Sequence, residues 1–320
     1  MEVTMNCFLR LLLIGFTGML LILSAQTNLY ADEEQTWQKV FDVKPGGLLS
    51  LESDIGSVDI VGTTSDKVEV EVVAIVDAHS REKARKILDD FTLDFEQDSN
   101  SVSVFGKYKR QRSSFWGSVS NNIRVEFNIS VPSQYDIDIY TAGGSIVISD
   151  LSGKVTVETS GGSLHFDGIK GTIHGNTSGG SITLRDCSGD CDVETSGGHI
   201  DITGVLGQVV ANTSGGGINI EEVSGMIDAS TSGGGISARI VGQPKDDCRL
   251  ETSGGGIVVY LNKDISVDIN AETSAGHVES DFPVTTRGKI HRSSLHGRIN
   301  AGGPELYLHT SAGNIEIIEI

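Results

Sequence analysis

Apolar residues recur in the second half of the chain with a spacing that marks short β-strands. Two aliphatic positions keep their phase around each copy of a Thr-Ser-Gly-Gly-like tetrad, as Val209 and Ile218 do four before and five after Thr213. Alternation of apolar and polar residues on either side predicts strands with one buried face. The tetrads begin at Thr141, Thr159, Thr177, Thr195, Thr213, Thr231 and Thr252, with Thr-Ser-Ala-Gly at Thr273 and Thr310.

The first five intervals between tetrads are 18 residues and the next two are 21. Each unit therefore contains two short strands and two glycine turns. A single unit cannot bury its apolar face, whereas stacked units share a continuous core. We predict a mainly β, β-solenoid-like stack of 18-residue two-strand repeats over residues 136–320. The degenerate copy Ser294–Gly297 is expected to supply a further rung.

Paired glycines are predicted to form the repeat turns, where close backbone approach excludes a Cβ atom. These structural turn residues are Gly143, Gly144, Gly161, Gly162, Gly179, Gly180, Gly197, Gly198, Gly215, Gly216, Gly233, Gly234, Gly254 and Gly255. The threonine–serine columns beside them either form hydrogen bonds along the stack or bind ordered water on an outer face.

Residues 36–135 differ in kind from the repeats. They contain one helix candidate, residues 80–90, with Ser80 as its N-cap, and several strand candidates, including Val68–Val76 and Ile123–Val131. We predict a small α+β N-terminal cap that covers one end of the stack and is continuous with it as one domain.

The chain begins with an export signal. Leu11–Leu23 is uncharged, follows Arg10 and precedes small residues, as in a secretory signal peptide. We predict a signal peptide over residues 1–25, with cleavage after Ala25 or Ala31; an uncleaved anchor is the alternative. The expected location is secreted, periplasmic or otherwise in the cell envelope.

Composition narrows the set of partners. The 320 residues contain 24 Lys and Arg against 43 Asp and Glu, a net charge of −19. This balance argues against nucleic acid as a partner and against tight binding to anionic membranes.

Three cysteines remain after the signal segment. Cys187, Cys191 and Cys248 occupy repeat positions that hold aliphatic residues in other units, so buried free thiols are one interpretation. Cys187 and Cys191 also flank a short Ser-Gly turn, so a disulfide between them is the second interpretation, and a metal or redox role is the third.

No motif indicates a catalytic, cofactor or metal site. His199 and His277 share a repeat position but lie rungs apart, and no metal-binding spacing of His and Cys is present.

The residues directly before the tetrad threonines form a row of outward, mostly polar side chains. This row is either a solvated face or a surface for a cation or polar glycan: Glu158, Asn176, Glu194, Asn212, Ser230, Glu251 and Glu272. Phe115 and Trp116 lie in a polar loop, where they either contact a partner or pack on the cap.

Three segments carry a resemblance to a known family. The lead-in Val131–Ile139, the tandem Thr-Ser-Gly-Gly-x-Ile rungs and the closing segments Phe282–Val284 and Gly297–Ile317 resemble an exported bacterial β-strand-repeat family of unknown function, known as putative adhesins. The resemblance covers about residues 36–320. It implies a cell-envelope location and a repeat scaffold, and it carries no catalytic or ligand-binding residues.

These observations predict a non-enzymatic scaffold of the cell envelope that binds through its strand faces. The expected partner is a cell-wall or surface glycan, a matrix component or an envelope protein. The alternative is an envelope-stress or assembly accessory protein that engages a membrane partner. A glycan-active enzyme is a minor alternative, for which Asp201 and Glu221-Glu222 are the available acids.

Overall fold

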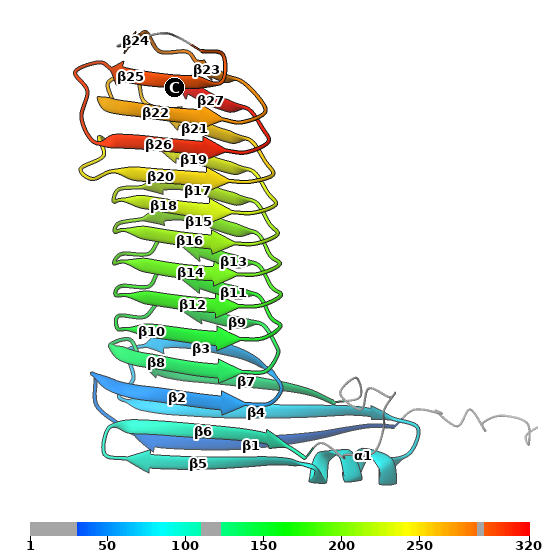
Figure 1. Ribbon diagram of the computed structural model, residues 1–320. Helices are drawn as coiled ribbons and strands as arrows, with labels where there is room; N and C mark the ends of the chain where they lie inside the picture. The colour runs from blue at the N-terminus through cyan, green and yellow to red at the C-terminus, as the bar shows by residue number, and fades with distance from the viewer. Residues whose placement is uncertain (1–30, 110–122, 287–290) are drawn as a thin grey trace, which may run out of the picture.

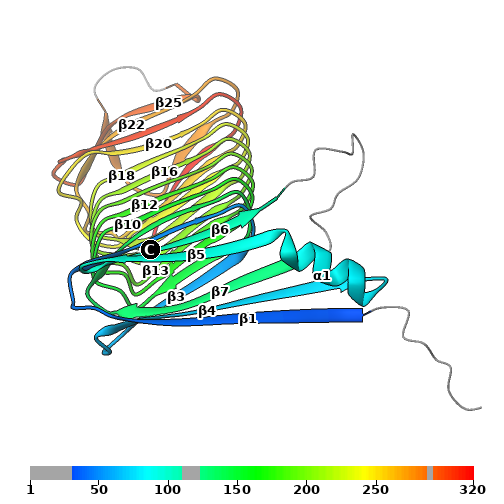
Figure 2. The same cartoon turned by 90° about the horizontal axis from the view of Figure 1, so that it is seen from below.

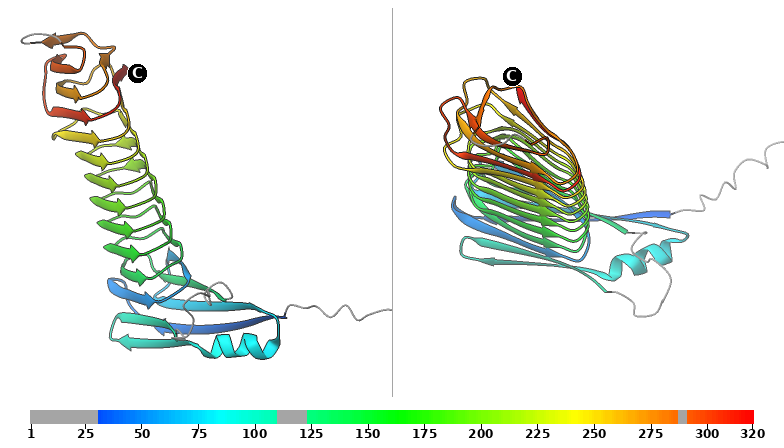
Figure 3. Two further views of the ribbon diagram at one scale, coloured as in Figure 1. Left: turned by 45° about the vertical axis from the view of Figure 1, so that its right-hand side comes forward. Right: turned by 45° about the horizontal axis from the view of Figure 1, so that its top comes forward.

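Two long β-sheets run through the described part of the chain and face each other across a hydrophobic core. The computed structural model describes residues 31–109, 123–286 and 291–320. Sheet A has 13 strands and sheet B has 14. Together they form a tall stack that stands on a broader N-terminal cap (Figures 1 and 3). The predicted mainly β, solenoid-like fold with one helix is confirmed.

Each repeat gives one strand to each sheet, and strands of successive repeats pair in parallel. Val155 pairs with Ile173, and Ile173 pairs with Cys191, so one step along sheet B is one 18-residue repeat. The repeat strands of sheet B are β8 (Tyr135–Thr141), β10 (Val155–Thr159), β12 (Ile173–Thr177), β14 (Cys191–Thr195), β16 (Val209–Thr213), β18 (Ile227–Thr231) and β20 (Cys248–Thr252). Those of sheet A are β9 (Ile146–Ser149), β11 (Leu164–Asp167), β13 (Ile182–Arg185), β15 (Ile200–Val205), β17 (Ile218–Val223), β19 (Ile236–Ile240) and β21 (Ile257–Leu261).

The core is built from the inward side chains of these strands. In β15, Ile200 and Ile202 are fully buried while Asp201 between them is exposed. Each buried aliphatic side chain contributes about 1.5–3 kcal/mol through the hydrophobic effect. Because successive rungs add their side chains to the same core, each rung depends on its neighbours for stability.

A column of buried threonines holds the turns together. The Thr195 hydroxyl donates to the carbonyl of Gly180 in the preceding rung at 2.7 Å, and it accepts from the Gly198 amide at 3.2 Å. The same inter-rung bond recurs at Thr177, Thr213, Thr231, Thr252, Thr273 and Thr310. The threonines are buried, so they bond along the stack, and the alternative of a water-binding outer array is wrong for them.

The second glycine of each pair lies against the turn of the preceding rung. A Cβ atom at Gly162 would collide with the carbonyl of Gly144, and Gly144 itself has a φ of +115°. In contrast, a Cβ atom at Gly143 or Gly161, the first glycine of its pair, would meet no atom within 4 Å. In the pairs Gly143–Gly144 and Gly161–Gly162, close backbone approach therefore requires only the second glycine.

The cap extends both sheets. Its elements are β1 (Ala31–Asp42), β2 (Gly47–Ser53), β3 (Ser57–Thr63), β4 (Lys67–Ala78), α1 (Arg81–Asp89), β5 (Phe91–Asp98), β6 (Ser101–Tyr108) and β7 (Ile123–Pro132). β2 pairs with β8 and β3 pairs with β9, both in parallel, so the cap shares the sheets of the stack. The Ser80 side chain accepts from the Lys83 amide at 3.3 Å and caps α1, as predicted. Figure 2 shows α1 beside the end of the cap strands.

The far end of the stack does not follow the order of the sequence. It contains β22 (Val267–Thr273), β23 (Val278–Ser280), β24 (Val284–Thr286), β25 (Ser294–Ile299), β26 (Glu305–Thr310) and β27 (Ile315–Glu319). β26 lies between β20 and β22, and β27 lies between β21 and β23. The degenerate copy Ser294–Gly297 is not a parallel rung, because it belongs to β25, which pairs antiparallel with β22. Among the described residues, no helix is both long and apolar enough to span a membrane.

Candidate binding surface

The outer face of sheet B carries the predicted polar row. From Glu158 to Glu251 its members pair in register across successive strands, and all of them are exposed or half-buried. The predicted continuation to Glu272 is interrupted, because His309 of the inserted β26 pairs with both Glu251 and Glu272. The row is therefore continuous from Glu158 to Glu251, and beyond Glu251 the imidazole of His309 lies between two acids, Glu251 and Glu272.

All three described cysteines are free and buried. The Cys187 thiol donates to the Arg185 carbonyl at 3.1 Å, and the Cys191 thiol donates to the Gly189 carbonyl at 3.6 Å. The alternative of a Cys187–Cys191 disulfide is therefore wrong for this structure: each sulfur is turned toward a backbone carbonyl. Burial, with smaller effects from Cys187 and Asp190, raises the pKa of Cys191 to about 12. Such a thiol is a core side chain and a poor nucleophile or metal ligand.

Two histidines each lie beside one carboxylate. His174 Nδ1 lies 3.4 Å from a carboxylate oxygen of Asp192, and His277 Nε2 lies 3.2 Å from one of Glu279. Within the described ranges, no group of three or more His, Cys, Asp or Glu side chains has a metal-binding arrangement. The predicted contact residues Phe115 and Trp116, and the signal segment 1–25, lie outside the described residues.

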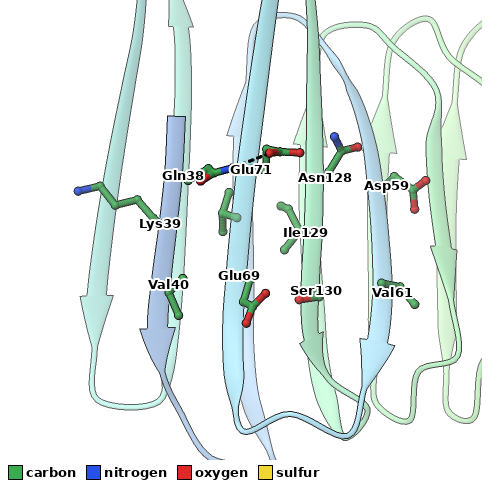
Figure 4. A pocket seen from close by; sticks show the side chains of 11 residues that line it. Gln38, Lys39, Val40, Asp59, Val61, Glu69, Glu71, Asn128, Ile129 and Ser130 are labelled. Atoms are coloured by element: carbon green, nitrogen blue, oxygen red, sulfur yellow. Dashed lines mark hydrogen bonds between the residues drawn. The ribbon is translucent and has the colours of Figure 1, made fainter. Parts of the chain in front are cut away.

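One open groove lies on the outer face of sheet A, over the cap. It has a volume of about 540 Å³ and crosses β1, β4, β7 and β3 (Figure 4). Gln38 Nε2 donates to Glu71 Oε1 at 2.7 Å, and Glu69 and Asp59 place two more carboxylates along the groove. Val40, which is 59% exposed, adds an aliphatic surface. The groove combines hydrogen-bond acceptors, amides and an apolar patch on an open surface, which suits contact with an extended polar molecule.

A second groove of about 540 Å³ lies farther along the same face. Gly217, Gly235 and Gly256 line it at successive rungs, and Asn219 and Ser237 lie beside them. His199, also in its lining, accepts from the Gly217 amide through Nδ1 at 3.0 Å. Asp201, one of the acids considered for glycan chemistry, also lines this groove. Its side chains and open backbone offer hydrogen-bond donors and acceptors along the stack.

Two outward tyrosines are covered by arginines on neighbouring strands. The guanidinium carbon of Arg239 lies 5.6 Å from the ring centre of Tyr260, and that of Arg249 lies 4.7 Å from the ring centre of Tyr307. Tyr140, an outward tyrosine of β8, is 53% exposed. The sequence interpretation overlooked Tyr140, although an aromatic residue at the repeat position of Glu158 was a readable signal.

Comparisons with known proteins define the family. A family model described as Toastrack DUF4097 matches residues 49–318. Solved structures that match this chain include a putative cell adhesion protein from Clostridium sporogenes, with 15% identity, a TM-score of 0.23, and coverage of 89% of this chain and 100% of that one. Another is a putative adhesin from Bacteroides fragilis, with 9% identity, a TM-score of 0.37 and coverage of 89% and 97%. A putative lipid binding protein from Parabacteroides distasonis has 12% identity, a TM-score of 0.35 and coverage of 89% and 96%. The search of curated proteins found no match.

Proposed function

The chain belongs to the Toastrack DUF4097 family, and from this premise we propose that it is an exported, non-enzymatic scaffold of the cell envelope. In this proposal it binds a glycan, matrix or envelope partner through the outer faces of its two sheets. The N-terminal segment Leu11–Leu23 supports export, since it has the length and flanking residues of a secretory signal.

The observation that carries this proposal is the contrast between the two grooves and the core. The inner positions of the rungs are filled by aliphatic side chains, so the interior is packed. The two grooves, by contrast, are open surfaces of sheet A, each spanning several strands. Repeat proteins with such surfaces bind by area, through many modest contacts, and an extended polar partner matches this geometry.

Capture by isolated envelope fractions tests the proposal. The purified chain is incubated with cell wall, with a glycan array and with solubilised envelope proteins, and bound protein is measured against concentration. We expect saturable binding to at least one of the three. Ser237→Arg places a long side chain in the second groove, and Thr183→Arg is its matched control at the equivalent repeat position outside the groove lining. Loss of binding with the first variant alone would locate the contact, and no saturable binding to any fraction would overturn the proposal.

A further inference from the structure

Arginines cover outward tyrosines at two places in this fold, and in both the arginine and the tyrosine are register partners on neighbouring parallel strands. Arg239 pairs in register with Tyr260 across β19 and β21, and Arg249 pairs with Tyr307 across β20 and β26. At the second place Arg249 Nη2 also lies 2.7 Å from Glu251 Oε1, so the guanidinium contacts a ring and a carboxylate together. A guanidinium is suited to this because it is planar and weakly hydrated.

Tyr140 also has a ring beside carboxylates, but glutamates take the register positions that an arginine takes beside Tyr307. Its register partners on the two neighbouring strands are Glu52 of β2 and Glu158 of β10, and both are exposed. Within the described part of the chain, the Tyr140 side chain makes no hydrogen bond or ring contact, and neither glutamate forms an ion pair. Among the described residues, none places a cation over this ring, and Tyr140 is 53% exposed.

The pattern continues across the cap. Phe105 of β6 pairs with Glu52 on one side and with Asp94 of β5 on the other. The acid–aromatic strip is thus formed, in strand order, by Asp94, Phe105, Glu52, Tyr140 and Glu158. It crosses β5, β6, β2, β8 and β10, the lowest five strands of sheet B in Figure 1. Lys107, two residues after Phe105, is the single Lys or Arg residue within these five strands.

We propose that the acid–aromatic strip binds arginine side chains of a basic segment on a partner protein. This inference rests on the proposed binding role of the strand faces, and it specifies the chemistry of one partner: a segment that presents arginine side chains. Each incoming guanidinium would lie over Tyr140 or Phe105 and contact the flanking carboxylates, as Arg249 does with Tyr307 and Glu251. The net charge of −19 favours encounter with such a partner.

The spacing of the strip also defines the segment. Phe105 and Tyr140 lie two strands apart, which is about 9.6 Å at the usual strand spacing. In a polyproline II segment, residues i and i+3 project from the same side about 9.3 Å apart. An Arg-Pro-Pro-Arg segment therefore matches both aromatic positions, whereas adjacent arginines match one.

The test uses fluorescent peptides and the purified chain. We expect the Arg-Pro-Pro-Arg peptide to bind more tightly than a peptide of the same composition with adjacent arginines, and more tightly than its lysine counterpart. Tyr140→Ala weakens binding about 2- to 30-fold, the range of exposed to desolvated cation–π contacts, and Tyr140→Phe retains it. Glu158→Gln weakens binding, while Glu194→Gln, two strands farther along the same row, leaves it unchanged. Because these side chains are exposed, circular dichroism should confirm an intact fold in each variant.

Two results would overturn the inference: unchanged affinity in Tyr140→Ala, or equal losses in Glu158→Gln and Glu194→Gln, which would indicate attraction by overall charge. Equal binding of the two arginine spacings would overturn the assignment of two cation positions. If the chain captures envelope components and wild type does not bind the peptide, the strip is wrong and the proposed function stands. If peptide binding depends on Tyr140 and all three fractions fail to bind, the proposed function is wrong and the strip stands.

Discussion

Gly161 and Gly162 are adjacent in one turn, yet alanine should have opposite consequences at the two positions. A Cβ atom at Gly162 collides with the Gly144 carbonyl, whereas a Cβ atom at Gly161 meets nothing within 4 Å. In Gly162→Ala the two rungs must move apart at the turn. That movement strains the 2.9 Å bond from the Ile146 amide to the Ser163 carbonyl and the 3.3 Å bond from the Ser160 amide to the Thr141 carbonyl.

The size of the effect follows from these contacts. Two weakened hydrogen bonds cost about 0.5–1.5 kcal/mol each, and overpacking costs about 1–3 kcal/mol, so we expect a loss of roughly 2–6 kcal/mol. At about 2–4 °C per kcal/mol for a large domain, that corresponds to a fall in Tm of about 4–24 °C. Gly161→Ala should leave Tm unchanged or raise it slightly, because alanine lowers the entropy of the unfolded chain. Thermal melts followed by circular dichroism measure both. Similar Tm values for the two variants would refute the close-packed turn as the reason for the glycine.

Four further predictions follow from the core and the ends of the stack. Ile200→Asp should abolish the cooperative melt, since it buries a charge, while Asn212→Asp should change stability by less than about 0.5 kcal/mol. Thr195→Val should cost about 1–3 kcal/mol in urea unfolding, because it leaves the Gly180 carbonyl without its buried donor. The raised pKa of Cys191 stabilises the fold below pH 9.0, and this contribution is lost as pH rises from 9.0 toward about 12. Melts between pH 8 and 11 should therefore show a falling Tm. Melts with and without reductant should give the same Tm, because the described cysteines are free thiols. Deletion of residues 301–320 removes β26 and β27, which lie between β20 and β22 and between β21 and β23. Without them β22 and β23 lose these neighbours, so trypsin should cut at Lys263, between β21 and β22, faster than in the full chain. Equal resistance of the two chains would contradict the inserted order.

The repeats could be predicted from the sequence because their information is local. Alternation around Ile200 gives the buried face, and the constant interval between threonines gives the register, since equivalent residues of parallel rungs must stack. The inserted β26 could not be predicted in this way. Thr273 and Thr310 have the same local pattern, so nothing nearby determines which of them lies beside Thr252. That order depends on the antiparallel pairing of β22 with β25, which occupies the other edge of β22.

The candidate binding residues also divide into positions that the local repeat predicts and surroundings that depend on distant strands. The outward position of Glu158 followed from its place in the repeat, and the structure gives that position. The surroundings of Tyr140 depend on a partner strand from the cap, β2, whose register against β8 has no repeat to define it. The second groove was also overlooked: Gly217, Gly235 and Gly256, which directly follow the paired turn glycines, are not among the residues that the sequence pattern singled out.

The acid–aromatic strip exists because the cap and the repeats share one sheet. Asp94, Phe105 and Glu52 come from strands outside the repeat, while Tyr140 and Glu158 occupy the same position in consecutive repeats. Farther along the row the ladder continues with amides, a serine and acids, whereas the contact of Arg249 with Tyr307 lies in the neighbouring outward row, two residues earlier on each strand. Along the row of Tyr140, the tyrosine and phenylalanine rings lie among carboxylates at the cap end. A basic partner is therefore expected at the cap end of sheet B, where two aromatic rings lie among three carboxylates and Lys107 is the single cation of the five strands, and not along the whole face.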